Sequence, residues 1–326
     1  MWSIEEWVIR YLSLEALQRK NWLAGPYLRQ FIMLERRMIK RMWPGGLFFF
    51  VVLAALTWYQ VPLVSSQGII IRSHYQAGEV PSFPTDADWE TVSPLPVPLS
   101  GQIITRPVWP EPSARALSIR SIHNGKDIAF LLEWQDATVN ESLTPGVFRD
   151  GAAVALPLGD APAFFCMGQL DHYVNIWHWK ADWQSDVDRR AERAAESKND
   201  RKGPRRFEVI PRRPSSVEDL IGGGFSTLTS KEQQGRIQGH AEWKNGLWRV
   251  VMKRPLSMEG DDLDNEARLV AGRMQAVAFA VWNGENKERN GQKAVASWMQ
   301  LQIDPIDTTV GQIPKVHGYV SPPSSS

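Results

Sequence analysis

The chain has 326 residues, enough for one large domain or two of ordinary size. Its 37 Lys and Arg residues balance 36 Asp and Glu residues, so the charge indicates no general affinity for nucleic acids or other polyanions. A single cysteine, Cys166, excludes an internal disulfide framework, a Cys-rich zinc or iron–sulfur site, and a haem attached through a Cys-x-x-Cys-His motif.

An N-terminal membrane anchor is the first predicted element. Residues 1–41 are helix-prone and end in a basic cluster, whereas residues 42–71 contain no charged side chain. The apolar stretch at 42–64 is long enough to cross a bilayer as one helix. The positive-inside rule then predicts a single-pass protein of the cytoplasmic membrane, with residues 1–41 as a cytoplasmic extension and the main domain on the periplasmic, extracytoplasmic side. A buried core helix is the alternative, and the long basic region argues against a cleaved signal peptide.

The rest of the chain is predicted to be mainly β. After a linker at 65–84, apolar and polar residues alternate with a period of two, and Asn-Gly turns at Asn124 and Asn245 indicate two β-hairpins. Many short strands separated by turn signals favour an antiparallel β-sandwich, here assigned to residues 85–310. The charge-rich residues 184–235 are predicted to be a long solvated insertion with a helical turn near 187–197, and residues 311–326 a disordered tail.

One stretch concentrates potential metal ligands and aromatic rings. Residues 161–183 contain Cys166, Met167, His172 and His178 among Phe, Tyr and Trp side chains, and residues 278–298 are a second aromatic stretch. Trp side chains fill β cores or stack on flat ligands. Two such strands facing each other, each with one ligand atom, are suited to a flat apolar cofactor such as haem b, which needs no covalent attachment. Taken alone, a Met beside aromatic rings is core packing most of the time, so the residues alone do not select this function.

Other chemistry receives little support. The chain contains no Gly-x-Ser-x-Gly elbow, Walker loop, dinucleotide glycine motif or His-Glu-x-x-His motif. His172 and His178 are six residues apart and therefore share one face of a strand, but no cluster supplies the further ligands that zinc needs.

Five motifs in order carry a resemblance to a known family. They are Phe148-Arg-Asp-Gly-Ala-Ala-Val-Ala-Leu-Pro157, Phe165-Cys-Met-Gly168, Val174-Asn-Ile-Trp-His-Trp-Lys-Ala-Asp-Trp183, Trp248-Arg-Val-Val-Met-Lys-Arg-Pro-Leu256, and Phe279-Ala-Val-Trp-Asn-Gly-Glu-Asn286 followed by Gly291-Gln-Lys-Ala-Val-Ala-Ser-Trp298. Over residues 85–305 the chain resembles the haem b-binding gamma subunit of ethylbenzene dehydrogenase. Relatives of that subunit serve dimethyl sulfide dehydrogenase, selenate and chlorate reductases, and nitrite oxidoreductase.

The resemblance implies a β-sandwich that holds one non-covalent haem b between a Met and a Lys. By position, these axial ligands fall on Met167 and Lys293, with Lys287 as the nearest competitor and His172 or His178 as the ligand if the set has changed. A Lys can ligate only as the neutral amine, a form that burial favours. The candidate side chains for the haem slot or its surroundings are Phe165, Trp177, Trp179, Trp282 and Trp298.

The predicted function is that of a membrane-anchored electron-transfer subunit of a multi-subunit respiratory oxidoreductase. The resemblance implies that the haem passes electrons between an iron–sulfur or molybdenum subunit and a cytochrome or quinone-linked chain, and that this subunit converts no substrate itself. Family members are commonly soluble periplasmic proteins, so the anchor and the 184–235 insertion are departures from the pattern. The alternatives are a carbohydrate- or ligand-binding β-sandwich whose Trp rings stack on sugars, and a haem-free structural subunit.

Overall fold

A computed structural model describes residues 68–159, 161–164, 166–199, 210–233, 235–257 and 265–307. The predicted cytoplasmic extension at 1–41, the anchor at 42–64 and the tail at 311–326 lie outside the described residues. Within the described ranges, no helix combines the length and the hydropathy that a membrane span requires. The domain boundaries therefore stay a prediction.

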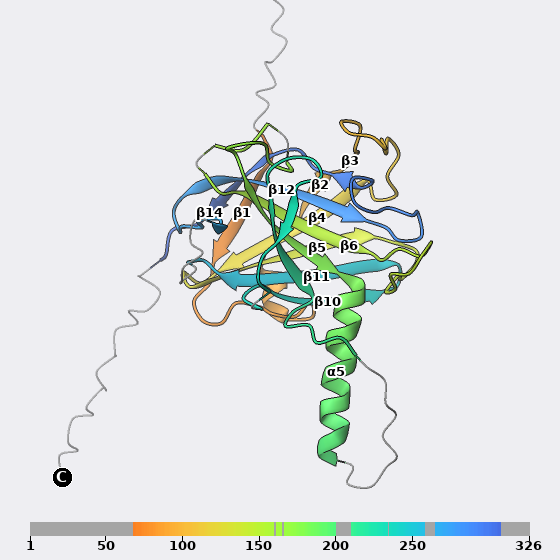
Figure 1. Cartoon of the computed structure of the whole chain (residues 1–326). Helices are drawn as coiled ribbons and strands as arrows, with labels where there is room; N and C mark the ends of the chain where they lie inside the picture. The colour runs from red at the N-terminus through yellow and green to blue at the C-terminus, as the bar shows by residue number, and fades with distance from the viewer. Residues whose placement is uncertain are drawn as a thin grey trace, which may run out of the picture. The chain divides into compact units, whose positions relative to one another are not determined.

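The described part of the chain is mainly β, as predicted, and forms one 14-stranded sheet (Figure 1). The strands are β1 (Ile70–Tyr75), β2 (Leu95–Pro98), β3 (Ser100–Gly101), β4 (Ala116–His123), β5 (Asp127–Gln135), β6 (Gly151–Pro157), β7 (Val174–Lys180), β8 (Val217–Gly222), β9 (Leu228–Ser230), β10 (Gln238–Lys244), β11 (Leu247–Pro255), β12 (Met274–Trp282), β13 (Ala294–Val295) and β14 (Met299–Ile303). A short 3-10 helix, η1 (Ala87–Thr91), and the α-helix α5 (Ala181–Asn199) accompany them.

The sheet is mixed rather than wholly antiparallel. Its main path runs β10-β11-β5-β4-β1-β14-β12-β6-β7-β8-β9, with β2 paired to β4 and β13 paired to β12 and β3. All these pairs are antiparallel except those of β1, which is parallel to both β4 and β14. The prediction of an antiparallel sandwich is wrong at this strand, because β1 reaches the sheet by long connections rather than by hairpins.

The two halves of the sheet pack against each other in a sandwich-like arrangement. Strand β12 links them, since residues 274–277 pair with β14 and residues 278–282 pair with β6. Phe130 on β5 contacts Trp177 on β7 with ring centroids 5.9 Å apart, and Trp134 contacts Trp179 at 6.2 Å. These residues belong to one buried core that draws on both halves.

Local turn chemistry accounts for the two predicted hairpins, which the strand pairing confirms. Asn124 accepts hydrogen bonds from the backbone N–H groups of Lys126 and Asp127 between β4 and β5. Asn245 and Gly246 take the positive φ values of 53° and 76° that a tight turn between β10 and β11 requires.

Residues 184–235 differ from the predicted solvated insertion. Helix α5 follows β7 directly, buries Trp183 and Asp186 in its first turns, and extends away from the strands (Figure 1). Strand β8 then pairs with β7 over six residues and belongs to the sheet. Its carboxylates Glu218 and Asp219 obscure the strand in the sequence, but they are paired with Lys180 and Lys231.

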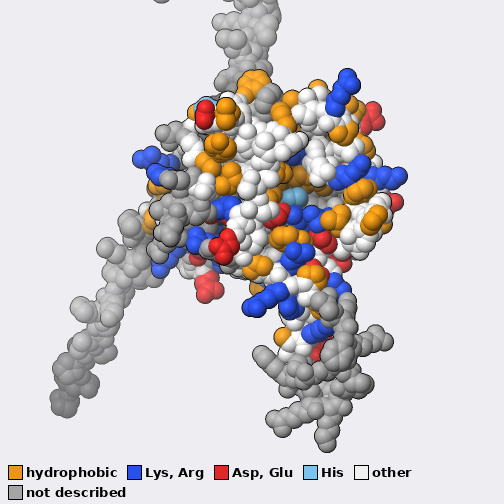
Figure 2. Space-filling model, viewed as in Figure 1, with side chains coloured by type: hydrophobic (Ala, Val, Ile, Leu, Met, Phe, Trp, Pro, Cys, Tyr) orange, Lys and Arg blue, Asp and Glu red, His pale blue; other side chains and the backbone are white. Residues whose placement is uncertain are grey.

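Lys and Arg side chains are interspersed with Asp and Glu on the face shown in Figure 2, and exposed hydrophobic side chains lie between them. This face has no field of a single sign, which agrees with the formal net charge of +1.

Candidate cofactor site

An apolar pocket lies on the outer face of β6, β7 and β12. The inward residues of β6 and β12, among them Val154, Leu156 and Phe279, fill the core, whereas Ala153, Ala155, Ala278 and Ala280 face outward. Ala153 is paired with Ala280, and Ala155 with Ala278, so the four methyl groups form one flat surface. The pocket above them holds about 700 Å³ of empty space, including the part open to solvent. Besides the alanines, its lining contains Gln102, Ile104, Cys166, Met167, Ile176, His178, Leu220, Phe225, Leu228, Phe279, Trp282, Lys293 and Val295.

Glycine contacts hold the loop that carries Met167. Gly168 has a φ of 78°, and a Cβ placed there would lie 2.3 Å from the carbonyl oxygen of Gly222. The carbonyl of Met167 in turn accepts a hydrogen bond from the N–H of Gly224 at 3.0 Å. Only glycine allows so close an approach of the two backbones. The Gly222–Gly224 segment, which lies in the insertion predicted at 184–235, therefore positions Met167.

Lys293 is positioned from the opposite side by the loop between β12 and β13. Arg289 and Gln292 exchange two backbone hydrogen bonds across a turn in which Asn290 has a φ of 51°. The indole of Trp282 donates to the carbonyl of Asn290 at 3.1 Å, and the Gln102 amide donates to the carbonyl of Gly291 at 3.1 Å. The side chain of Lys293 is thereby directed into the pocket.

The amine of Lys293 meets the thioether of Met167 inside the pocket. The Nζ–Sδ distance is 3.0 Å, and Lys293 is only 6% exposed. In the described part of the chain, no carboxylate pairs with this amine. Burial lowers the pKa of Lys293 to about 8, so a neutral amine with a free lone pair is accessible near neutral pH. The geometry brings together the two ligands that the resemblance implies.

The other potential ligands differ in how well they suit a metal. Burial raises the pKa of the Cys166 thiol to about 11, which keeps it protonated at neutral pH. His178 also lines the pocket, and burial lowers its pKa and so favours the neutral imidazole that can ligate a metal. Its ring is held by stacking on Trp282, with ring centroids 4.5 Å apart. His172 and Lys287 are exposed on turns and do not line the pocket. Among the residues with described positions, no three or more His, Cys, Asp or Glu side chains gather as a metal site.

The predicted aromatic side chains divide between two faces. Trp282 lines the pocket, and Trp298 packs beside it while donating to the carbonyl of Ala163 at 2.7 Å. Trp177 and Trp179 are fully buried in the core, because alternation on β7 turns them away from His178. Their assignment to a cofactor slot is therefore corrected. Phe165 lies outside the described residues.

A comparison with known protein families establishes the family to which the chain belongs. The sequence profile of the ethylbenzene dehydrogenase family matches residues 86–294, well over half of the chain. The chain belongs to the ethylbenzene dehydrogenase family.

Three curated proteins are similar to this member of the family. The proposed heme subunit of a respiratory nitrate reductase from Haloferax mediterranei is 28% identical over 231 residues, which cover 70% of this chain and 71% of that protein. The gamma subunit of chlorate reductase from Ideonella dechloratans is 27% identical, with 59% and 66% covered. The gamma subunit of dimethylsulfide dehydrogenase from Rhodovulum sulfidophilum is 27% identical, with 75% and 82% covered.

Among solved structures, a family 9 carbohydrate-binding module from Caldicellulosiruptor kristjanssonii in complex with glucose is similar over 74% of this chain and 98% of its own. The identity is 10% and the TM-score is 0.39, values too low to carry an argument.

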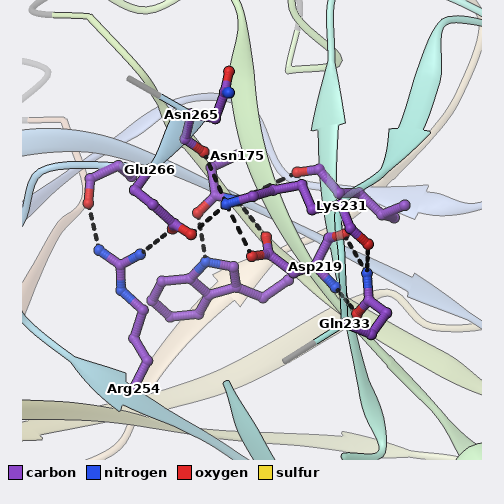
Figure 3. Close-up of polar contacts among 10 residues, drawn as sticks. Asn175, Asp219, Lys231, Gln233, Arg254, Asn265 and Glu266 are labelled. Atoms are coloured by element: carbon purple, nitrogen blue, oxygen red, sulfur yellow. Dashed lines mark hydrogen bonds and ion pairs between the residues drawn. The ribbon is translucent and has the colours of Figure 1, made fainter. Parts of the chain in front are cut away.

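A buried charge network, drawn in Figure 3, lies on the face of β7 and β8 that carries the core residue Trp177. The amine of Lys231 lies between the carboxylates of Asp219, at 3.2 Å, and Glu266. Glu266 also accepts from Arg254 on β11 at 2.9 Å, and Asp219 accepts from Asn175 on β7 at 2.6 Å. The network ties the strands of the pocket to the other half of the sandwich.

Proposed function

We propose that this chain is a haem b electron-transfer subunit of a membrane-bound respiratory oxidoreductase. The observation that carries the proposal is the buried amine of Lys293, which has no carboxylate partner in the described part of the chain and contacts Met167 over a flat surface of alanines. A buried amine without a charged partner destabilises a fold. Coordination of a bound group by the lone pair of the amine would account for its presence in the pocket. The similarity to the Haloferax protein, which is named as a heme subunit, supports the same cofactor.

The donor set fits a haem better than it fits a bare metal ion. A porphyrin needs a flat apolar slot and one or two axial ligands, and a thioether with an imidazole is one such pair. Here the neutral amine of Lys293 would take the place of the imidazole. The 3.0 Å between Nζ and Sδ is shorter than two metal–ligand bonds of about 2.0–2.3 Å each. Binding one iron therefore requires these two side chains to move apart, and Met is among the most adaptable side chains in a core.

The bound haem would supply a reversible one-electron reduction of iron, and the chain would set its conditions. The thioether of Met167 would favour the ferrous state and raise the reduction potential. The neutral amine of Lys293 would add no charge next to the iron. The alanine surface and Ile176 would exclude water from the ring faces and keep the local dielectric low.

The proposed surroundings are a membrane and partner subunits. Chlorate reductase and dimethylsulfide dehydrogenase, whose gamma subunits resemble this chain, are multi-subunit enzymes. We expect an iron–sulfur or molybdenum subunit on one side of the haem, a cytochrome or quinone-linked chain on the other, and an anchor at 42–64. Ile104 and Leu228 line the pocket and are 60% and 47% exposed, which suits a partner that covers the pocket mouth.

The test is an optical spectrum of the full-length chain, purified in detergent with its native complex. A reduced-minus-oxidised spectrum and pyridine extraction would show a b-type haem in about one copy per chain. Met167→Ala and Lys293→Ala should each lose or shift the α-band, whereas the matched control Lys287→Ala should keep it. A folded complex without haem, or unchanged spectra in both ligand variants, would refute the proposal.

A further inference from the structure

A second, polar pocket adjoins the apolar one. It holds about 990 Å³ of empty space, including the part open to solvent. The two pockets share four lining residues, His178, Leu220, Leu228 and Trp282, and therefore lie side by side. A ligand that fills the apolar pocket can extend past His178 and Trp282 into the polar one.

The charges of the polar pocket leave one cation available. Arg149 is paired with Asp182 at 2.8 Å, and Lys180 is paired with Glu218. Arg289 differs, since no carboxylate pairs with it in the described part of the chain. Its guanidinium carbon lies 4.5 Å from the ring centroid of Phe148, and one N–H donates to the carbonyl of Lys287 at 2.7 Å. These contacts hold the guanidinium in place without neutralising it.

The acidic groups Glu288 and Asp150 of the same pocket are bound to partners other than Arg289. Glu288 accepts hydrogen bonds from the Trp109 indole, from the N–H and hydroxyl of Ser113, from the N–H of Asn283 and from the Asn286 amide. Asp150 is buried, and burial raises its pKa to about 7, so part of it is neutral at physiological pH.

We propose that the polar pocket binds the propionate carboxylates of the haem, with Arg289 as the cation that recognises them and His178 as a hydrogen-bond donor at the junction. This inference rests on the proposed function. A haem is an apolar ring with two carboxylates on one edge, and those carboxylates are costly to bury unless they are paired. Arginine is suited to this role because its planar guanidinium binds a carboxylate through two parallel hydrogen bonds.

The experiment compares haemin with its dimethyl ester, in which both carboxylates are masked. The full-length chain in detergent is freed of haem and titrated with each compound, and the Soret band and tryptophan quenching report binding. The unchanged chain should prefer haemin by about tenfold or more, the size of effect expected for a charge-assisted pair. Arg289→Gln should remove most of that preference by weakening haemin alone, whereas Arg268→Gln, at an exposed arginine beside a different pocket, should preserve it.

Each result has a distinct meaning. Equal affinities for haemin and ester in the unchanged chain would overturn the carboxylate site while leaving haem binding intact. An Arg289→Gln variant that loses both compounds equally would show a structural role and overturn the assignment of Arg289. Failure of the unchanged, folded chain to bind either compound would refute the proposed function itself.

Discussion

Replacing Lys293 with Met should stabilise the haem-free chain, and it would exchange the amine proposed to ligate the iron for a second thioether. Lys293 is 6% exposed, and in the described part of the chain its amine has no carboxylate partner. Met has nearly the same length and volume but carries no charge, so the variant removes the cost of burying an ammonium group and changes the packing little.

The shift in pKa gives the magnitude of this effect. The pKa of Lys293 falls from its ordinary value of 10.5 to about 8 in the folded chain. Each pKa unit corresponds to about 1.4 kcal/mol, so the buried amine costs the haem-free fold about 3 kcal/mol wherever the amine is charged in both states.

The cost depends on pH in a defined direction. Below pH 8 the amine is protonated in both the folded and the unfolded chain, and the full cost applies. Between pH 8 and 10.5 the unfolded chain binds more protons than the folded chain, so the stability of the unchanged chain rises with pH. The advantage of Lys293→Met should therefore shrink from about 3 kcal/mol at pH 7 to about 1 kcal/mol at pH 10.

Urea unfolding of the haem-free, full-length chain in detergent, followed by tryptophan fluorescence, measures this difference. Lys287→Met is the matched control, because Lys287 is exposed and its replacement should change stability by less than about 0.5 kcal/mol. A destabilised Lys293→Met variant, or an equal gain at pH 7 and pH 10, would refute the reasoning.

Two further variants probe the pocket surface and the charge network. Ala280→Leu places a larger side chain on the flat surface and should lower haem occupancy at least about tenfold, as measured by pyridine extraction. The free energy of unfolding in urea should stay within about 1 kcal/mol of the unchanged chain, because the pocket has room for the larger side chain. Arg254→Met removes the fully buried guanidinium that pairs with Glu266 and should lower the free energy of unfolding in urea by about 3 kcal/mol. A loss below about 1 kcal/mol would mean that Lys231 alone compensates the negative charge of Glu266.

The parts of the fold that are determined by residues close together in the sequence could be predicted from the sequence. The turns at Asn124 and Asn245 specify their hairpins locally, and the alternation around them gives the strands. Strand β8 could not be predicted in this way. Its Glu218 and Asp219 indicate a solvated segment until the distant Lys180 and Lys231 are known to pair with them.

The aromatic side chains show that residue type alone does not predict which residues line the pocket. Trp177 and Trp179 have the size of cofactor-stacking rings, but strand alternation places them in the core and turns His178 to the pocket. The more informative signal is a row of small residues. Ala153 and Ala155 of β6 lie opposite Ala280 and Ala278 of β12, and four adjacent alanine side chains leave space for a ligand.

The positions of Met167 and Lys293 follow from backbone contacts between segments far apart in the sequence. The carbonyl of Met167 accepts from Gly224, and Gly168 packs against Gly222 at a distance that no side chain permits. A search for catalytic or metal-binding motifs overlooks such glycines because they carry no functional group. They nevertheless fix the loop that carries Met167 against β8. Strand β8, which its charged residues make hard to predict from the sequence, thereby becomes part of the wall of the pocket.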